Sequence, residues 1–159
     1  MKQPVSLGVL AGFVLVCTGL TPVSAEPPAR SPVGEWRFKT STMNEGCTLS
    51  GSMTITRKAD KTMACTFKAL WACTQVVPRS VETNQTCTAK QTGSNVTLTS
   101  KIASIGKVTP SELADFMRAN YAADHFQVKI DTTGDRMDGL FHSYGQASVT
   151  FRRHLELIG

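Results

Sequence analysis

Alternation of apolar and polar residues in short segments is the feature that most constrains how this chain can fold. In residues 48–57, Leu49, Met53 and Ile55 alternate with serine and threonine, and residues 63–73 repeat the pattern. A period of two places successive side chains on opposite faces of an extended chain. Each segment is therefore predicted to be a β-strand with one buried face and one polar face.

Turn residues separate eight such segments, and most of them follow one another as hairpins. The predicted strands cover residues 34–40, 48–57, 63–73, 82–92, 95–102, 126–130, 136–144 and 147–153. Consecutive strands with one polar face predict a mainly β fold, an antiparallel meander rolled into a barrel or a sandwich. We expect the eight-stranded barrel, because closure removes the exposed edges of the sheet.

One short helix is expected near residues 110–121, between the fifth and sixth strands. Thr109 is placed as its N-cap, Pro110 follows at the first helical position, and Glu112 lies three residues after the cap. Four apolar residues then recur at helical spacing: Leu113, Phe116, Met117 and Tyr121. We interpret this stripe as the face that docks on the barrel rather than as a cofactor-binding segment.

The N-terminus has the organisation of a cleaved secretory signal. Lys2 precedes an almost continuously apolar stretch from Leu7 to Leu20, and small residues lead to Ala25. The stretch is shorter than the roughly 18 to 20 residues that span a bilayer, which disfavours an uncleaved anchor. We expect cleavage after Ala25 and a periplasmic or secreted protein that has no membrane attachment.

Three regions follow from these patterns: a signal peptide at 1–25, a proline-rich flexible arm at 26–33, and a single barrel domain at 34–159. The domain has a comfortable size for one hydrophobic core. The formal net charge of the whole chain is +5, but its basic residues are scattered and are not interleaved with aromatic residues. This distribution argues against nucleic-acid binding, and we expect a monomer.

The cysteine content favours disulfides over a metal site. Of five cysteines, Cys17 lies in the signal, which leaves an even number in an exported domain. No two of them have the C-x₂₋₄-C spacing of a zinc site, and the histidines lie far downstream. We therefore expect two structural disulfides, no metal and no cofactor.

Strand parity predicts which cysteines pair. The second and third strands both carry apolar residues at odd positions, so an in-register hairpin pairs odd with odd and sets Cys47 opposite Cys73. Cys65 and Cys87 remain, on the apolar face of the next hairpin. The alternative, Cys65–Cys73, would join residues about 26 Å apart along one extended strand, which would then have to break.

The two ends of the domain resemble the calycin pattern of lipocalins and related barrels. The resemblance rests on Gly34-Glu35-Trp36 in the first strand and Phe151-Arg152-Arg153 in the last. It implies that Trp36 packs across the barrel end beneath Arg152 or Arg153, as a structural closure. Residues 34–49 are also similar to the opening of small bacterial inhibitors of serralysin-type metalloproteases, calycin-like barrels whose N-terminal arm enters the protease active site.

No catalytic constellation is recognised in the sequence, and an enzyme is not expected. His142 and Ser143 are adjacent in a predicted strand, so their side chains point to opposite faces and cannot form a nucleophile–base pair. A two-residue turn at 145–146 would place His142 on the buried face, and a longer loop would place it toward solvent. Asp124 and His125 at a strand start are interpreted as an exposed polar pair.

The sequence is consistent with two non-enzymatic functions. The first is a non-enzymatic binding protein that holds a small apolar ligand in the barrel, with Met53, Phe67 and Trp71 as large inward-facing candidates. These side chains fill the core in the alternative interpretation, as in other small eight-stranded barrels. The second is a protein-binding module, such as a periplasmic protease inhibitor, that acts through the proline-stiffened arm.

Overall fold

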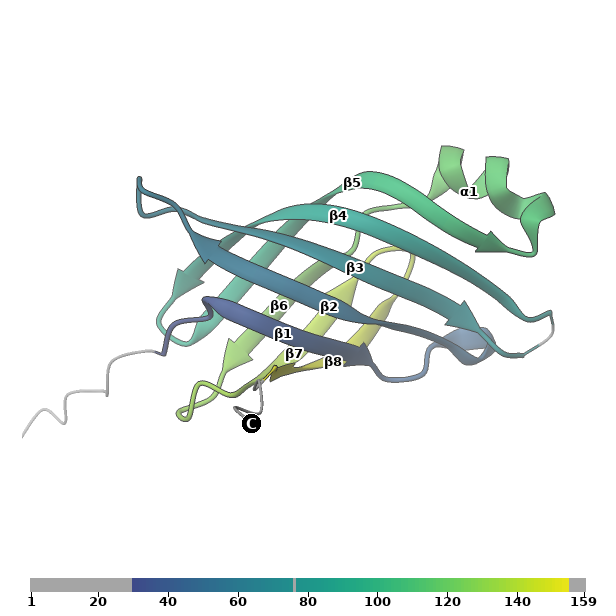
Figure 1. Ribbon diagram of the computed structural model, residues 1–159. Helices are drawn as coiled ribbons and strands as arrows, with labels where there is room; N and C mark the ends of the chain where they lie inside the picture. Colours follow the sequence, from purple (N-terminus) through teal and green to yellow (C-terminus); the bar gives the residue numbers. More distant parts are fainter. Residues whose placement is uncertain (1–29, 76, 155–159) are drawn as a thin grey trace, which may run out of the picture.

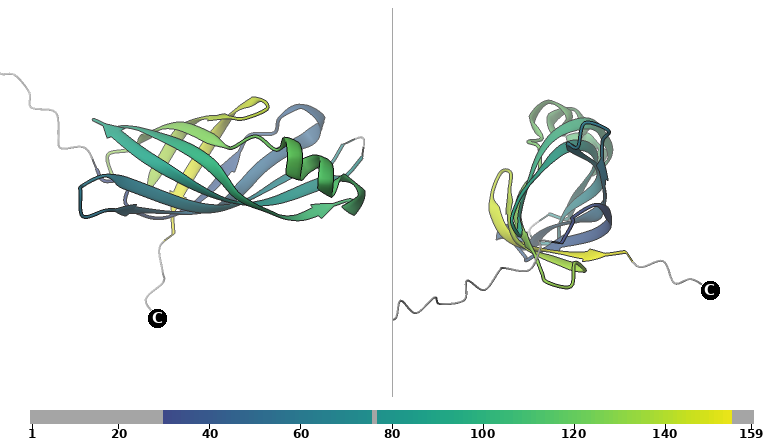
Figure 2. Two further views of the ribbon diagram at one scale, coloured as in Figure 1. Left: turned by 90° about the horizontal axis from the view of Figure 1, so that it is seen from above. Right: turned by 90° about the vertical axis from the view of Figure 1, so that its left-hand side faces the viewer.

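The computed structural model describes residues 30–75 and 77–154, which form a closed antiparallel barrel of eight strands in sequential order. Figure 2 shows the strands enclosing one space when the molecule is viewed along its length. The strands are β1 (Gly34–Thr40), β2 (Cys47–Arg57), β3 (Met63–Cys73), β4 (Arg79–Thr92), β5 (Asn95–Thr109), β6 (His125–Ile130), β7 (Arg136–His142) and β8 (Gln146–Arg153). The predicted mainly β meander barrel is confirmed. The predicted signal peptide, residues 26–29 of the arm and residues 155–159 of the domain lie outside the described residues.

Burial follows the alternation that predicts the strands. Most inward residues of β2, β3 and β4 are buried, whereas most of their outward neighbours are exposed or half-buried. The centre of the barrel is a cluster of phenylalanine rings around Phe126, whose centroid lies 5.3 Å from that of Phe38 and 5.8 Å from that of Phe67. Close edge-to-face packing of this kind fills the middle of the barrel with side chains.

Gly51 makes room for this aromatic cluster. It pairs with Phe38 across β1 and β2, and a Cβ added there would lie 2.7 Å from the ring of Phe38 and 2.1 Å from the carbonyl oxygen of Lys68. Such separations are far below ordinary carbon contacts. The glycine on the apolar face of β2 therefore allows a ring and a neighbouring backbone to approach.

Both disulfides join residues that face each other in the hairpin register. β2 and β3 pair Cys47 with Cys73, and β3 and β4 pair Cys65 with Cys87. Both pairs are bonded, so the structure contains the two disulfides that strand parity predicts. Two disulfides indicate an oxidising, extracytoplasmic environment.

The helical segment differs from its prediction at its start. Thr109 is not an N-cap, because it belongs to β5 and pairs with Ser80 of β4. A short 3₁₀ helix, η2 (Ser111–Leu113), precedes α1 (Ala114–Asn120), and neither has a side-chain cap. Pro110, with extended backbone angles, takes the N-cap position, so the helical segment begins at Ser111, one residue later than predicted. No helix in residues 30–75 or 77–154 is long and apolar enough to cross a membrane.

The strand β5 is much longer than the predicted segment at 95–102. Its pairing with β4 shifts register twice, between Val81 and Thr83 and between Asn84 and Gln85, with the extra residues in β5. Each bulge reverses the in–out alternation and bends the strand. The apolar pattern therefore fades near Ile102 although the strand continues to Thr109.

Candidate functional site

The candidate site lies where β5 parts from β6. These strands pair only from Asn95 to Leu98 of β5, whereas the remainder of β5 continues alongside β4 alone within the described chain. Figure 1 shows the far end of β5 leading into α1 at one end of the barrel. We call this the helix end, and the opposite end, where β1 begins and β8 finishes, the arginine end. The separation leaves room between α1 and the strands.

A cavity of about 580 Å³ occupies this space between α1 and the barrel. Its size falls in the range of small-molecule sites. Phe116 and Tyr144 line this cavity and are among the large hydrophobic side chains that are exposed to solvent, at 61% and 67%. The apolar and aromatic residues of the wall are Trp71, Leu113, Phe116, Met117, Tyr121 and Tyr144.

The predicted apolar stripe of the helix therefore lines a cavity and does not pack flat on the barrel. Leu113, Met117 and Tyr121 are only partly buried. Two larger depressions, of about 710 and 730 Å³, lie elsewhere on the strands and are lined mainly by exposed or half-exposed residues, many of them charged or polar. The helix end is the place where a cavity and exposed aromatic side chains coincide.

A second cavity, of about 500 Å³, adjoins the first and extends toward the barrel. Trp71, Arg79, Tyr121 and Tyr144 line both cavities, so the two are neighbours across a shared wall. Asp124 belongs to the lining of the second cavity. Together the cavities form one composite site, apolar beneath α1 and more polar toward the strands.

Asp124 is the most unusual side chain of this site. It is 1% exposed, and its Oδ2 accepts hydrogen bonds from Gln85 Nε2 and, at 3.3 Å, from the Tyr121 hydroxyl. Its backbone N–H donates in return to Gln85 Oε1 at 3.0 Å. The other carboxylate oxygen, Oδ1, has no hydrogen-bond partner within the described part of the chain. A buried acceptor left unpaired is costly, and such groups often mark functional sites.

Burial raises the pKa of Asp124 to about 6, although the polar side chains of Gln85, Tyr121 and Ser143 oppose this effect. Removal from water disfavours the charged form of a carboxyl group. Burial also raises the pKa of Tyr121, and the nearby charge of Asp124 adds to the effect. Asp124 therefore changes charge close to neutral pH.

Asp124 corrects the interpretation made from the sequence. It does not form an exposed polar pair with His125, because the turn from α1 into β6 directs it inward onto Gln85. His125 is half-buried, and its Nδ1 accepts the backbone N–H of Ser100. The partner of Asp124, Gln85, lies 39 residues away in sequence, so no local sequence pattern predicts the contact.

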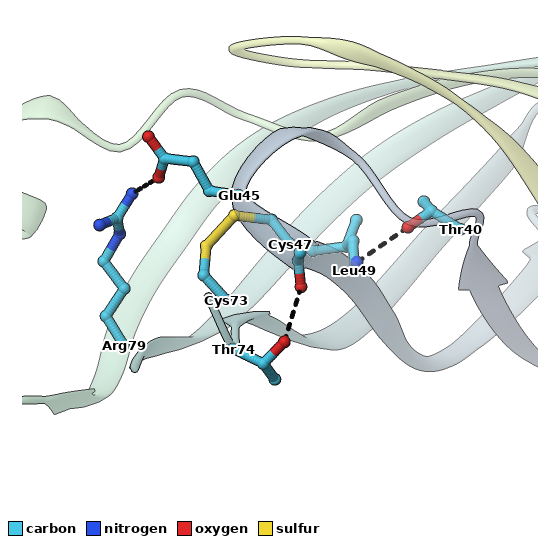
Figure 3. The surroundings of a disulfide bond; sticks show 8 residues. Thr40, Glu45, Cys47, Leu49, Cys73, Thr74 and Arg79 are labelled. Carbon is cyan, nitrogen blue, oxygen red and sulfur yellow. Dashed lines mark hydrogen bonds and ion pairs between the residues drawn. A yellow bond between two sulfur atoms is a disulfide. The ribbon is translucent and has the colours of Figure 1, made fainter. Parts of the chain in front are cut away.

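An ion pair and a disulfide stabilise the wall of the composite site that the 3₁₀ helix η1 (Asn44–Gly46), β3 and β4 form. Arg79, at the start of β4, pairs with Glu45 of η1, and its guanidinium carbon lies 5.6 Å from the centre of the Trp71 ring. Figure 3 shows this ion pair beside the Cys47–Cys73 disulfide. The disulfide ties the first residue of β2 to the last of β3, so the η1 turn and the end of β3 cannot separate.

The three predicted ligand-binding residues occupy different environments. Met53 and Phe67 are buried in the packed core, and neither lines any of the cavities described here. Trp71, near the end of β3, is partly buried and lines both cavities at the helix end. The interior of the barrel is thus filled around Met53 and Phe67, and open volume begins near Trp71.

The arginine end is closed by Trp36 and Arg153. The guanidinium carbon of Arg153 lies 4.4 Å from the centre of the Trp36 ring, and its nitrogens donate to the carbonyl oxygens of Gly134, Val33 and Ser31. Arg152 faces outward and is exposed. Of the two arginines, Arg153 therefore takes the position over the tryptophan.

The described part of the arm is bound to this closed end. Arg30 donates to the carbonyl oxygen of Thr132 and accepts from Gln91 through its own carbonyl. The indole N–H of Trp36 donates to the carbonyl oxygen of Pro32 at 2.8 Å. Residues 30–33 are consequently part of the barrel end.

The polar residues His142 and Ser143 have separate contacts and do not bond to each other. The loop between β7 and β8 has three residues, so His142 lies on the outer face and pairs with Gln146. Ser143 donates its hydroxyl proton to the carbonyl oxygen of Ala122 and not to a histidine. Among the described residues, no group of three histidine, cysteine or acidic side chains is arranged to hold a metal ion.

Comparison with known proteins gives a likeness of fold only. No protein-family model matches this chain, and no curated protein matches it in sequence. Among solved structures, it is similar to a de novo designed fluorescence-activating β-barrel, with 16% sequence identity and a TM-score of 0.43. The similarity covers 77% of this chain and 93% of the designed one.

Proposed function

We propose that this chain is a non-enzymatic, exported binding protein that holds a small apolar or amphipathic ligand at the helix end of the barrel. The observation that carries the proposal is the composite cavity, with an apolar part of about 580 Å³ under α1. An apolar pocket with a few convergent polar groups is the usual form of a small-molecule site. Because side chains fill the core around Phe67, we propose a ligand site at the end of the barrel and not in its interior, where the sequence predicts it.

The difference between the closed arginine end and the helix end, with its exposed aromatic side chains, supports the same proposal. Trp36 and Arg153 close one end with hydrogen bonds and ring contact, in the manner that the calycin resemblance implies. The other end carries the exposed side chains of Phe116 and Tyr144. A barrel closed at one end and open at the other suits a ligand that enters from a single side.

Binding of the neutral fluorescent probe N-phenyl-1-naphthylamine tests this function. The wild-type protein should enhance its fluorescence, and Phe116→Ser should weaken binding at least about tenfold, because a buried phenylalanine contributes about 1.5–3 kcal/mol. Leu140→Ser is the matched control, since Leu140 is also exposed but lies on the outer wall of β7. Absence of binding, or equal loss in both variants, would contradict the proposal.

The alternative function, a protein-binding module acting through the arm, is tested by truncation. Deleting residues 26–29 keeps the contacts of Arg30 and Pro32 with the barrel end. Probe binding at the helix end should then be unchanged. Inhibition of a metalloprotease by the full-length protein that is lost on this truncation would instead support the arm-mediated function.

A further inference from the structure

The buried carboxylate of Asp124 carries an inference about the chemistry of the ligand, which rests on the proposed function. One carboxylate oxygen is held by Gln85 and Tyr121, and the other, Oδ1, is unpartnered in a side chain that lines the second cavity. Asp124 is 1% exposed, so bulk water does not reach its carboxylate freely. A ligand group in this cavity is the natural partner for Oδ1.

The charges around the composite cavity define the sign of that partner. Three charged residues line it: Glu45, Arg79 and Asp124. Glu45 and Arg79 form an ion pair and balance each other. Asp124 has no counter-ion in the lining. When Asp124 is ionised, the lining therefore has a net charge of −1, which a cationic ligand would neutralise.

The aromatic wall matches a cation as well. Trp71, Tyr121 and Tyr144 line both cavities, and the rings of Tyr121 and Tyr144 stand edge to face with centroids 6.1 Å apart. Aromatic faces attract cations, and Arg79 already lies over one ring of this wall. Rings and a carboxylate together select an ammonium group over a neutral or anionic one.

The geometry points to an amphipathic amine as the ligand, with its protonated amino group donating to Asp124 Oδ1 and its apolar part lying under α1 against Phe116 and Met117. The carboxylate and the apolar side chains line adjoining cavities that share Trp71, so a single amphipathic molecule can contact both. A charge-assisted hydrogen bond in a buried site is stronger than a neutral one. An amine therefore gains affinity that an alcohol of equal length lacks.

Calorimetric titration with octylammonium, octanol and octanoate at pH 7.5 tests this assignment. The wild-type protein should bind octylammonium at least about tenfold more tightly than octanol, and octanoate most weakly. Asp124→Asn should abolish the preference for the amine and keep octanol binding. Asp138→Asn makes the same charge change on the outer wall of β7 and should behave as the wild type.

Titration at lower pH provides a second measurement on the unaltered protein. Because the pKa of Asp124 is raised to about 6, its protonation should remove the amine preference between pH 7.5 and pH 5. The other ionisable groups around it are Glu45, Arg79, Tyr121 and Tyr144 in the lining, and His125 and His142 on β6 and β7. The Asp124→Asn protein retains all of these groups, so its pH profile should be flat by comparison.

The outcomes separate the two proposals. Equal binding of the amine and the alcohol by the wild type, or an amine preference that survives in Asp124→Asn, would overturn the assignment of Asp124 and leave the binding function standing. Failure of all three compounds and of N-phenyl-1-naphthylamine to bind would overturn both. A preference that depends on Asp124 and on pH would support the amine.

Discussion

Replacing Asp124 with asparagine should make the unliganded protein more stable at neutral pH. The folded structure holds this carboxyl with a pKa of about 6, against 3.8 for the ordinary group, because burial disfavours its charged form. Between these two values the folded protein binds more protons than the unfolded chain. The free energy of unfolding therefore falls as the pH rises through this window, and it is highest below it.

The size of the effect follows from the two pKa values. Each unit of difference corresponds to about 1.4 kcal/mol, so ionising Asp124 costs the folded state about 3 kcal/mol by pH 7. Asparagine cannot ionise, and its carbonyl oxygen can accept the hydrogen bonds that Gln85 and Tyr121 donate. The variant should equal the wild type near pH 4 and exceed it by about 3 kcal/mol at pH 7.

Urea denaturation followed by circular dichroism, at pH values from 4 to 7.5, measures this difference. Every other side chain is the same in the two proteins, so the comparison isolates the carboxyl group of Asp124. Asp138→Asn is the control: a hydrogen bond from Arg136 lowers the pKa of Asp138, so its loss should not stabilise the protein at neutral pH. A stability gap that is constant with pH, or a less stable Asp124→Asn protein at pH 7, would refute the reasoning.

Three further predictions concern the frame of the barrel. Replacing Cys47 and Cys73 together with alanine should lower the free energy of unfolding by about 3 kcal/mol, because the bridge closes a loop with a sequence separation of 26, and unchanged urea midpoints would contradict this. Arg153→Gln should cost about 2 kcal/mol in chemical denaturation, through lost hydrogen bonds and contact with Trp36, while probe binding at the other end stays intact. Gly51→Ala should cost about 1–3 kcal/mol, since its Cβ would meet a ring and a carbonyl, and a thermal midpoint equal to that of the wild type would show that the core yields.

The strands and disulfides were predictable because each depends on a regular period. In-register hairpins keep odd positions opposite odd positions, so the alternation around Met53 also placed Cys47 opposite Cys73. The prediction failed for the second half of β5, where two bulges interrupt the period. It failed for the helix start as well, because β5 continues to Thr109 and the helical segment begins after Pro110, one residue later than the capping pattern predicts.

The candidate site was less predictable because its residues come from separate turns. Trp71 was identified as a large inward residue, but Arg79, Tyr121 and Tyr144 carry no motif that links them. Asp124 resembled an ordinary polar residue before a strand, and its burial depends on a tertiary contact with Gln85. One signal was available: both tyrosines of the chain flank the ends of predicted elements, where loops meet.

The departure of β5 from β6 has a consequence for how the protein behaves at high concentration. Over its second half, β5 has a neighbour in β4 but is not paired with β6 in the described structure. An unpaired strand edge is a template for association with a second chain. The helix α1 contacts β5, and the exposed Lys101 and Lys107 place positive charge on this part of the strand. These features guard against edge-to-edge aggregation, so the opening that creates room for a ligand also requires protection of the strand that it exposes.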